Sequence, residues 1–247
     1  MDFEIQVDDF TKMYGDLAAV DGLSFAVSRG EVLGLVGPNG AGKTTTLRAI
    51  AGIIAPTKGR ISIAGHDIAA DAVKAKSHLS FIPDEPHLFE YLTVEEHLRF
   101  IGRLYGVADT PALIPGILRE LELEDKRNSL PNELSRGMKQ KLAIACGLLH
   151  SPTALVLDEP LTGLDPAGMR RMKTTIASRA ANGAAVILSS HLLHLVEELC
   201  TRILIIRKGR ALAYGSLGDI VASRPELAGK SMEDVFLTLT EESSAPL

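Results

Sequence analysis

The chain has 247 residues and a formal net charge of −5, from 26 basic and 31 acidic residues. With 46% hydrophobic and 23% charged residues, it has the composition of a globular protein that can bury a core, which excludes a disordered chain. The acidic balance disfavours nucleic acid as a partner. We expect the two short basic clusters, at 170–173 and 207–210, to lie on the solvated surface.

The sequence also bears on location. The first residues, Met1 to Glu4, show no basic stretch followed by an apolar run, so we expect no signal peptide. There is no run of the ~20 apolar residues that a membrane helix needs, so we expect a soluble chain that reaches a membrane through a partner. Cys146 and Cys200 have no metal-binding or redox spacing, and we expect them to be buried, reduced thiols.

The first thirty residues predict antiparallel strands. Apolar residues alternate with polar or small ones around Phe3 to Val7 and again around Leu23 to Val27, as in half-buried strands. Three short apolar runs, Val32 to Val36, Ala154 to Leu157 and Ala184 to Leu188, are each followed by a helical pattern, which is typical of buried parallel strands. The expected fold class is therefore α/β.

The first apolar run leads into a phosphate-loop motif, GLVGPNGAGKTTT. It has the spacing of this motif and stands between a buried strand and a helix, as the motif requires; a plain glycine-rich turn is the alternative. Its glycines let backbone amides approach phosphates, Lys43 offers a compact charge, and the Thr44 hydroxyl suits Mg²⁺. The candidate nucleotide-binding residues are Gly37, Pro38, Asn39, Gly40, Ala41, Gly42, Lys43, Thr44 and Thr45.

From about Thr93 to His150 the pattern is helical. Thr93 opens the first helix with a capping box, and a second helix is predicted from Ala112 to Leu123, with Pro115 tolerated near its first turn. A third is predicted from Ser135 to Leu149. These helices indicate a division into an α/β core at about 1–83 and 151–215, a helical insertion at about 84–150, and a C-terminal tail at about 216–247, all within a single domain.

A second motif, TALVLDEP, brings two acids to the end of a buried strand. Asp158 can reach the coordination shell of Mg²⁺ there, and Glu159 is placed to accept a proton from an attacking water. The pair could instead cap a helix. Together with Lys43 it predicts hydrolysis of a nucleotide with Mg²⁺ as cofactor.

The segment NELSRGMKQK predicts a second anion site, about ninety residues after the phosphate loop. Ser135 and Gly137 stand where a helix begins, and the first amides of a helix have no carbonyl partner inside it. Taken alone, Ser135 would be an ordinary N-cap.

In this order and spacing, the motifs resemble those of the ATP-binding subunits of ABC transporters over nearly the whole chain. The segment LSRGM (134–138) stands where that family has its signature, LSGGQ, and GLDP (163–166) is similar to its D-loop. His191, in LSSH, is similar to the switch histidine. Tyr14 precedes the phosphate loop where the family has an aromatic that stacks on adenine.

The resemblance implies a P-loop NTPase core with an antiparallel β subdomain and a helical insertion. In that family two ATP-binding domains pair head to tail, and the signature of one closes over the ATP of the other. Glu159 and His191 would be catalytic, while Ser135, Arg136, Gly137 and Asp165 would act in trans. The working unit would be a two-fold homodimer, or a heterodimer with a similar subunit.

Two segments depart from the family pattern. The signature carries Arg136 and Met138 in place of a glycine and a glutamine, and Asp84 replaces the glutamine of the Q-loop. Asp84 could bind Mg²⁺ together with Thr44 and Asp158, pair with a cation on a partner, or be an exposed acid without a role.

The leading hypothesis is an ATPase subunit that drives a membrane transporter at the cytoplasmic face of the cell membrane, with transmembrane permease subunits as partners. The segments SMEDVFLTLT and SRGMKQK are most similar to bacterial multidrug or antibiotic exporters, which favours export over import. One alternative is a soluble ABC ATPase acting on ribosomes or DNA, although the sequence lacks the second domain, coiled coil or zinc-binding cysteines usual there. Another, a general P-loop phosphotransferase, is disfavoured by the signature and by His191.

Overall fold

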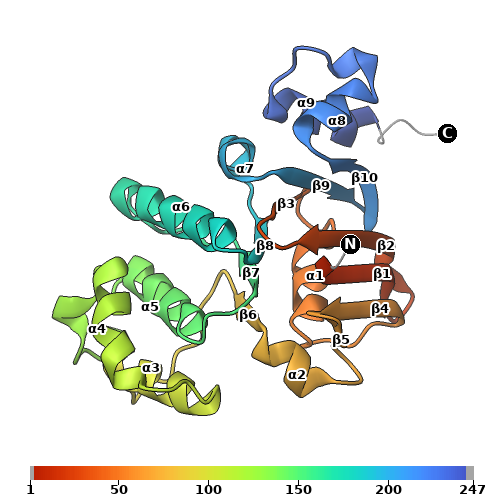
Figure 1. The fold of residues 1–247 in the computed structure, drawn as a ribbon. Helices are drawn as coiled ribbons and strands as arrows, with labels where there is room; N and C mark the ends of the chain where they lie inside the picture. The colour runs from red at the N-terminus through yellow and green to blue at the C-terminus, as the bar shows by residue number, and fades with distance from the viewer. Residues whose placement is uncertain (1–2, 243–247) are drawn as a thin grey trace.

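Two β-sheets and the helices around them make up the computed structural model, which describes residues 3–242 (Figure 1). The expected α/β class is confirmed. Residues 1–2 and 243–247 lie outside the described residues. The first two belong to the segment in which we expected no signal peptide, and the last five belong to the expected tail.

The smaller sheet is antiparallel and has the strand order β2-β1-β4-β5. The alternating segments form β1 (Phe3–Tyr14) and β2 (Leu17–Ser28), as predicted, with Val7 opposite Phe25. The sheet is extended by β4 (Lys58–Ile63) and the two-residue β5 (His66–Asp67), which the sequence analysis did not predict.

The larger sheet has the order β10-β9-β3-β8-β7-β6, and its strands are parallel except β10. The three predicted buried strands are neighbours in its centre, and all their residues are buried: β3 (Val32–Val36), β8 (Ala185–Ser189) and β7 (Ala154–Asp158). The flanking strands are β6 (Leu79–Ile82), β9 (Arg202–Arg207) and β10 (Arg210–Gly215). Because parallel strands end at one edge of a sheet, the segments after β3, β7 and β8 meet there.

Both faces of the larger sheet are covered. On one face, Leu47 and Ile50 of α1 (Lys43–Ile50) join a core that includes β3 residues and the antiparallel sheet. On the other face, Leu142 of α5 (Arg136–Leu148) and Ile176 of α6 (Pro166–Ala181) pack with β7 and β8. This explains the unbroken apolar runs of the central strands, since both sides of each strand face a hydrophobic layer.

The helices α3 (Val94–Leu104), α4 (Thr110–Glu120) and α5 form a group beside the sheets, at the lower left of Figure 1. The capping box of Thr93 is confirmed: its hydroxyl accepts from the Glu96 amide, and the Glu96 carboxylate accepts from the Thr93 amide. The predicted position of Pro115 is wrong. Because α4 begins earlier than expected, Pro115 lies in the helix interior. Burial of Ile114 and Leu118 stabilises the helix despite the hydrogen bond that a proline removes.

The C-terminal segment packs beyond the β9–β10 hairpin, at the top of Figure 1. After α7 (Leu193–Leu199) and the hairpin, the chain forms α8 (Leu217–Ala222) and α9 (Met232–Glu242). The short helix α2 (Ala72–Ser77) lies at the opposite end of the molecule, at the bottom of Figure 1. One face of α9 is buried, because Met232, Val235 and Leu239 lie in one cluster with residues of β3 and β9.

Cys146 and Cys200 are free thiols, and burial raises the pKa of each to about 12. Both side chains are only partly exposed rather than fully buried, so the expected burial holds in part, and the raised pKa keeps each thiol protonated and unreactive. Within residues 3–242, none of the helices combines the length and hydrophobicity that a membrane span requires.

Candidate functional site

A cleft of about 860 Å³ opens where the central strands of the larger sheet end. It is lined by residues from the glycine-rich loop, from the ends of β7 and β8, and from the β1–β2 turn and the β9–β10 hairpin. These are Tyr14, Leu17, Ala18, Ala19, Asn39, Gly40, Ala41, Gly42, Lys43, Thr44, Thr45, Asp84, Asp158, Glu159, Thr162, His191 and Lys208. Most of the residues predicted from separate motifs therefore share one cleft.

The backbone path of the glycine-rich loop requires glycine at two positions, Gly37 and Gly42. A Cβ on Gly37 would lie 2.3 Å from the carbonyl oxygen of Ile206 on β9, so Gly37 and Pro38 lie behind the cleft and not in its lining. Gly42 has φ +106° and begins α1, and no described side chain caps this helix end. The free amides at the start of α1 therefore face the cleft as donors for an anion.

Lys43 curls back over the loop. Its Nζ donates to the carbonyls of Gly37 at 2.6 Å and Pro38 at 3.2 Å. Burial lowers the pKa of Lys43, and the carboxylates of Glu159 and Asp158 oppose this shift. An anion bound beside the ammonium would replace the carbonyl contacts and favour its charged form.

Asp158 and Glu159 are held by Ser189 of the neighbouring strand. The Ser189 hydroxyl donates to Asp158 Oδ1 at 2.6 Å, and Asp158 is buried. The amide of Glu159 donates to the Ser189 hydroxyl at 3.0 Å and to its carbonyl at 3.2 Å. Glu159 has φ +49°, a left-handed conformation that is strained for a residue with a side chain. Asp158 is therefore a buried part of the cleft lining, while Glu159 is partly exposed beside His191.

His191 contacts Glu159. The His191 Nδ1 lies 2.9 Å from Glu159 Oε2, and the ring is 63% exposed. An exposed imidazole beside a carboxylate can hold a proton or orient a water at the cleft mouth.

The rim of the cleft includes residues that the sequence analysis missed. Lys208 belongs to the basic 207–210 cluster, for which we expected only solvated surface. The amide of Gly209 donates to the Ala41 carbonyl at 2.9 Å, which holds the hairpin against the glycine-rich loop. No local signal marks this contact, because it depends on β9 pairing with β3. Half-exposed Tyr14, the candidate for stacking on adenine, lines the same cleft.

Asp84 lines the cleft from the loop after β6. Its Oδ1 is shielded from solvent and has no hydrogen-bond partner among the residues that the structure describes. The closest cation is Arg136, with Nη2 at 3.5 Å from this oxygen. The carboxylate of Asp84 therefore has an oxygen free to bind a ligand, because its only ion-pair contact within the described residues is the 3.5 Å approach of Arg136.

The other predicted residues lie outside the cleft. Ser135 caps α5 by accepting from the Met138 amide at 3.3 Å, and Asp165 caps α6 by accepting from the Gly168 amide at 2.8 Å. The N-cap interpretation of Ser135 is confirmed. A Cβ on Gly137 would lie 3.0 Å from the Gly163 carbonyl, so the start of α5 packs against the loop before α6. Ser135, Arg136, Gly137 and Asp165 thus form a second group, which does not line this chain's own cleft.

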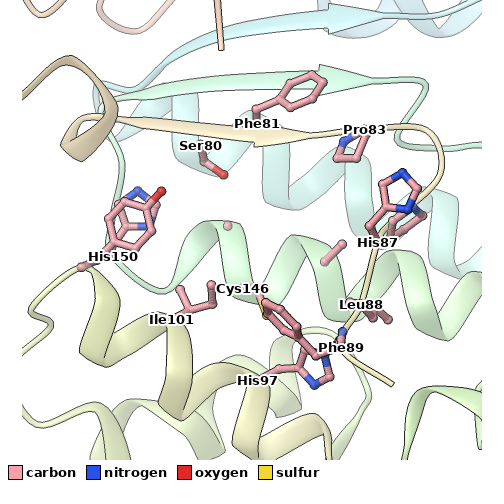
Figure 2. A pocket seen from close by; sticks show the side chains of 14 residues that line it. Ser80, Phe81, Pro83, His87, Leu88, Phe89, His97, Ile101, Cys146 and His150 are labelled. Atoms are coloured by element: carbon pink, nitrogen blue, oxygen red, sulfur yellow. Dashed lines mark hydrogen bonds between the residues drawn. The ribbon is translucent and has the colours of Figure 1, made fainter. Parts of the chain in front are cut away.

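A second, smaller pocket of about 250 Å³ lies between β6 with the loop after it, α3 and α5 (Figure 2). Its wall is largely aromatic and apolar, and it also contains His87, His97 and His150. His97 fixes the loop: its Nδ1 lies 2.8 Å from the Thr93 carbonyl, and its Nε2 accepts from the Phe89 amide at 2.9 Å. Burial lowers the pKa of His97.

Comparison with known proteins identifies the family of this arrangement. The family described as "ABC transporter" matches residues 20–162. The chain is 40% identical over 221 residues to "Nod factor export ATP-binding protein I" of Paraburkholderia xenovorans, covering 89% of this chain and 73% of that protein. It is 36% identical over 242 residues to "Probable multidrug ABC transporter ATP-binding protein YbhF" of Escherichia coli, of which it spans only 42%.

Solved structures similar to this chain also belong to ABC transporters. One described as "Structure of ATP binding subunit of ABC transporter" superposes with a TM-score of 0.91 at 36% identity, covering 96% of this chain and 99% of that one. A nucleotide-free ATP-binding cassette from an ABC transporter superposes with a TM-score of 0.77 at 24% identity, which supports the fold alone.

Proposed function

The chain belongs to the ATP-binding subunits of ABC transporters and is an ATPase, and from this premise we propose that it powers export through a membrane-spanning partner. Two relatives whose names state export or multidrug transport support the direction. Neither the comparisons nor the geometry favours the soluble alternative that acts on ribosomes or DNA.

One observation carries the proposal: the phosphate loop, Tyr14, the acidic pair Asp158–Glu159 and His191 all line one cleft. Amides at the start of α1 and Lys43 bind the phosphates of ATP, and Tyr14 stacks on the adenine. Glu159 accepts the proton of the attacking water, and His191, 2.9 Å from it, orients that water and contacts the γ-phosphate. Buried Asp158 is fixed by Ser189 and keeps its carboxylate directed at the base of the cleft.

The residues present fit Mg²⁺. Thr44, Asp158 and Asp84 line the same cleft, and the shielded Oδ1 of Asp84 lacks a hydrogen-bond partner within the described chain. Hydroxyl and carboxylate oxygens are the ligands that this cation prefers. When bound, it would neutralise phosphate charge; Thr44 and Asp158 would hold it, and Asp84 would add a further oxygen, directly or through water.

The second group completes the site of another subunit. Ser135, Arg136, Gly137 and Asp165 lie apart from their own cleft, which supports their action in trans on ATP held by a second chain. The working unit is then a head-to-tail dimer, with a second copy or with a similar subunit.

The partner docks on the second pocket, between the helical insertion (84–150) and the α/β core (1–83 and 151–215). Phe89 and Phe100 contact each other edge to face, with ring centroids 5.1 Å apart, and are 52% and 42% exposed. Exposed aromatic groups beside a pocket are suited to receive an apolar segment of another protein. Its occupant is a cytoplasmic segment of the transmembrane permease, and the location that goes with this proposal is the cytoplasmic face of the membrane.

Affinity purification of the tagged chain from detergent-solubilised membranes of its own organism tests this function. A protein with several membrane spans should be recovered with the wild type. Phe89→Ser and Phe100→Ser should lower its recovery by about fivefold or more, as for loss of an interface anchor. Leu113→Ser, at an exposed apolar residue of α4, is the matched control and should retain it. Recovery of ribosomal proteins instead would favour the soluble alternative and overturn the proposal.

A further inference from the structure

The two departures from the family's motifs contact each other. Asp84 replaces the Q-loop glutamine and Arg136 replaces a glycine of the signature, and Arg136 Nη2 lies 3.5 Å from Asp84 Oδ1. Asp84 belongs to the lining of the cleft, whereas Arg136 belongs to the group that the proposed function offers to a second subunit. One ion pair therefore joins the two functional regions of the chain.

The side chain of Arg136 has a second contact besides this pair. The stem of Arg136 runs along Gly163, because a Cβ on that glycine would lie 3.2 Å from Arg136 Cδ. Gly163 has φ +79° and lies in the loop before α6, so the guanidinium reaches Asp84 across this loop. Asp84 Oδ1 is shielded from solvent, and at 3.5 Å the guanidinium neutralises its charge without a good hydrogen bond.

We propose that Arg136 is a positioning residue for Asp84 and that the pair is an intrachain latch, closed in the single subunit and open in the ATP-bound dimer. The inference rests on the proposed function, because each partner has a stronger counter-charge in the assembled site. Asp84 turns to the divalent cation in its own cleft, and Arg136 turns to the phosphates held by the second chain. Filling one cleft thus releases the residue that completes the other.

The latch is weak enough to open. The side chains of Arg136 and Asp84 are 60% and 43% exposed, and exposed pairs contribute little and are screened by salt. While closed, the guanidinium competes with Mg²⁺ for the carboxylate. Removing Arg136 should therefore make the cleft accept Mg²⁺ more readily, provided that Asp84 is present.

The test is a double-mutant cycle on binding, with the full chain at a concentration where sedimentation shows single subunits. The half-saturating Mg²⁺ concentration for a fluorescent ATP analogue is measured for the wild type, Arg136→Gln, Asp84→Asn and the double variant. Arg136→Gln should lower this concentration about threefold at low salt, as expected for a partly screened pair, and should leave it unchanged in the Asp84→Asn background. The shift should fade at about 0.5 M salt.

Lys139→Gln is the matched control, because it removes a positive charge from the first turns of α5 without an ion pair to Asp84. It should shift the Mg²⁺ requirement equally in both backgrounds. No effect of Arg136→Gln, or an equal effect with and without Asp84, would overturn the latch. Lys43→Ala separates the two proposals: if ATP-analogue binding does not depend on Lys43, the proposed function fails, whereas Lys43-dependent binding without coupling removes the latch alone.

Discussion

At the scale of single residues, the backbone of Glu159 is the least expected feature of the cleft. A left-handed conformation costs a residue with a side chain about 1 kcal/mol or more, so surrounding contacts must maintain it. The two hydrogen bonds from its amide to Ser189 do so, and they direct the carboxylate to His191. The strained backbone of Glu159, maintained by Ser189 of β8, is consistent with a catalytic role that requires its carboxylate in one position.

Glu159→Gln should lower kcat at least about 100-fold, because the amide cannot accept the proton of the attacking water. ATP binding should persist, since the phosphate loop and Asp158 are unchanged. Steady-state hydrolysis and equilibrium binding of ATP measure the two effects separately. Glu197→Gln, an exposed acid on α7, is the control and should behave as the wild type. Full turnover by Glu159→Gln would refute the general-base role.

Much of the cleft could be predicted at this scale, and the reason is local spacing. Lys43, Asp158 and His191 each follow a buried strand within a recognisable motif, and neighbouring parallel strands deliver them to one edge. Ser189 and Lys208 could not be predicted. Their contacts depend on which strands pair, and neither lies in a motif that names its partner.

At the scale of elements, the loop after β6 and helix α3 are joined by a histidine that must stay neutral. His97 Nδ1 donates to the Thr93 carbonyl while Nε2 accepts from the Phe89 amide, so protonation of Nε2 would break the second bond. Burial lowers the pKa of His97 below its ordinary value of 6.5. The unfolded chain therefore takes up this proton first as the pH falls.

The free energy of unfolding should consequently be highest above pH 6.5 and decrease as the pH falls through 6.5 toward the lower pKa of the folded state. The slope from this histidine is at most about 1.4 kcal/mol per pH unit. Urea unfolding at pH 8, 6.5 and 5 should show a smaller pH dependence for His97→Gln. Part of the slope should remain, because burial also lowers the pKa of His150. His194→Gln, at an exposed site, should keep the wild-type slope; equal slopes for all three proteins would contradict the prediction.

Elements with strong local signals were predicted, and weak ones were not. The capping box of Thr93 and the apolar runs of β3, β7 and β8 define their own boundaries. By contrast, β5 has only two residues, and its pairing with β4 comes from tertiary contact. The predicted helix begins at Ala112, which would leave Pro115 near its first turn. The observed α4 begins at Thr110, and burial of Ile114 and Leu118 outweighs the cost of a proline in its interior.

At the scale of the whole molecule, the cleft with the glycine-rich loop and the group of Ser135, Arg136, Gly137 and Asp165 are separate regions of the described chain. None of the four residues in this second group lines the cleft. The order of the motifs predicts the family and the fold. The proposed dimer depends instead on how the surface with Ser135 and Gly137 contacts a second chain. We therefore expect activity to require two subunits, with each site built from both.

Mixed dimers test this central claim most directly. Ser135→Arg disables the signature and Lys43→Ala disables the phosphate loop, so each variant alone should be inactive. If the signature acts in trans, a mixed dimer keeps one intact site, made by the loop of one chain and the signature of the other. Random mixing makes half of the dimers mixed, so about a quarter of wild-type ATPase activity per chain should return. A mixture no more active than its two parents, with mixed dimers shown in ATP by co-purification of differently tagged chains, would contradict a shared site.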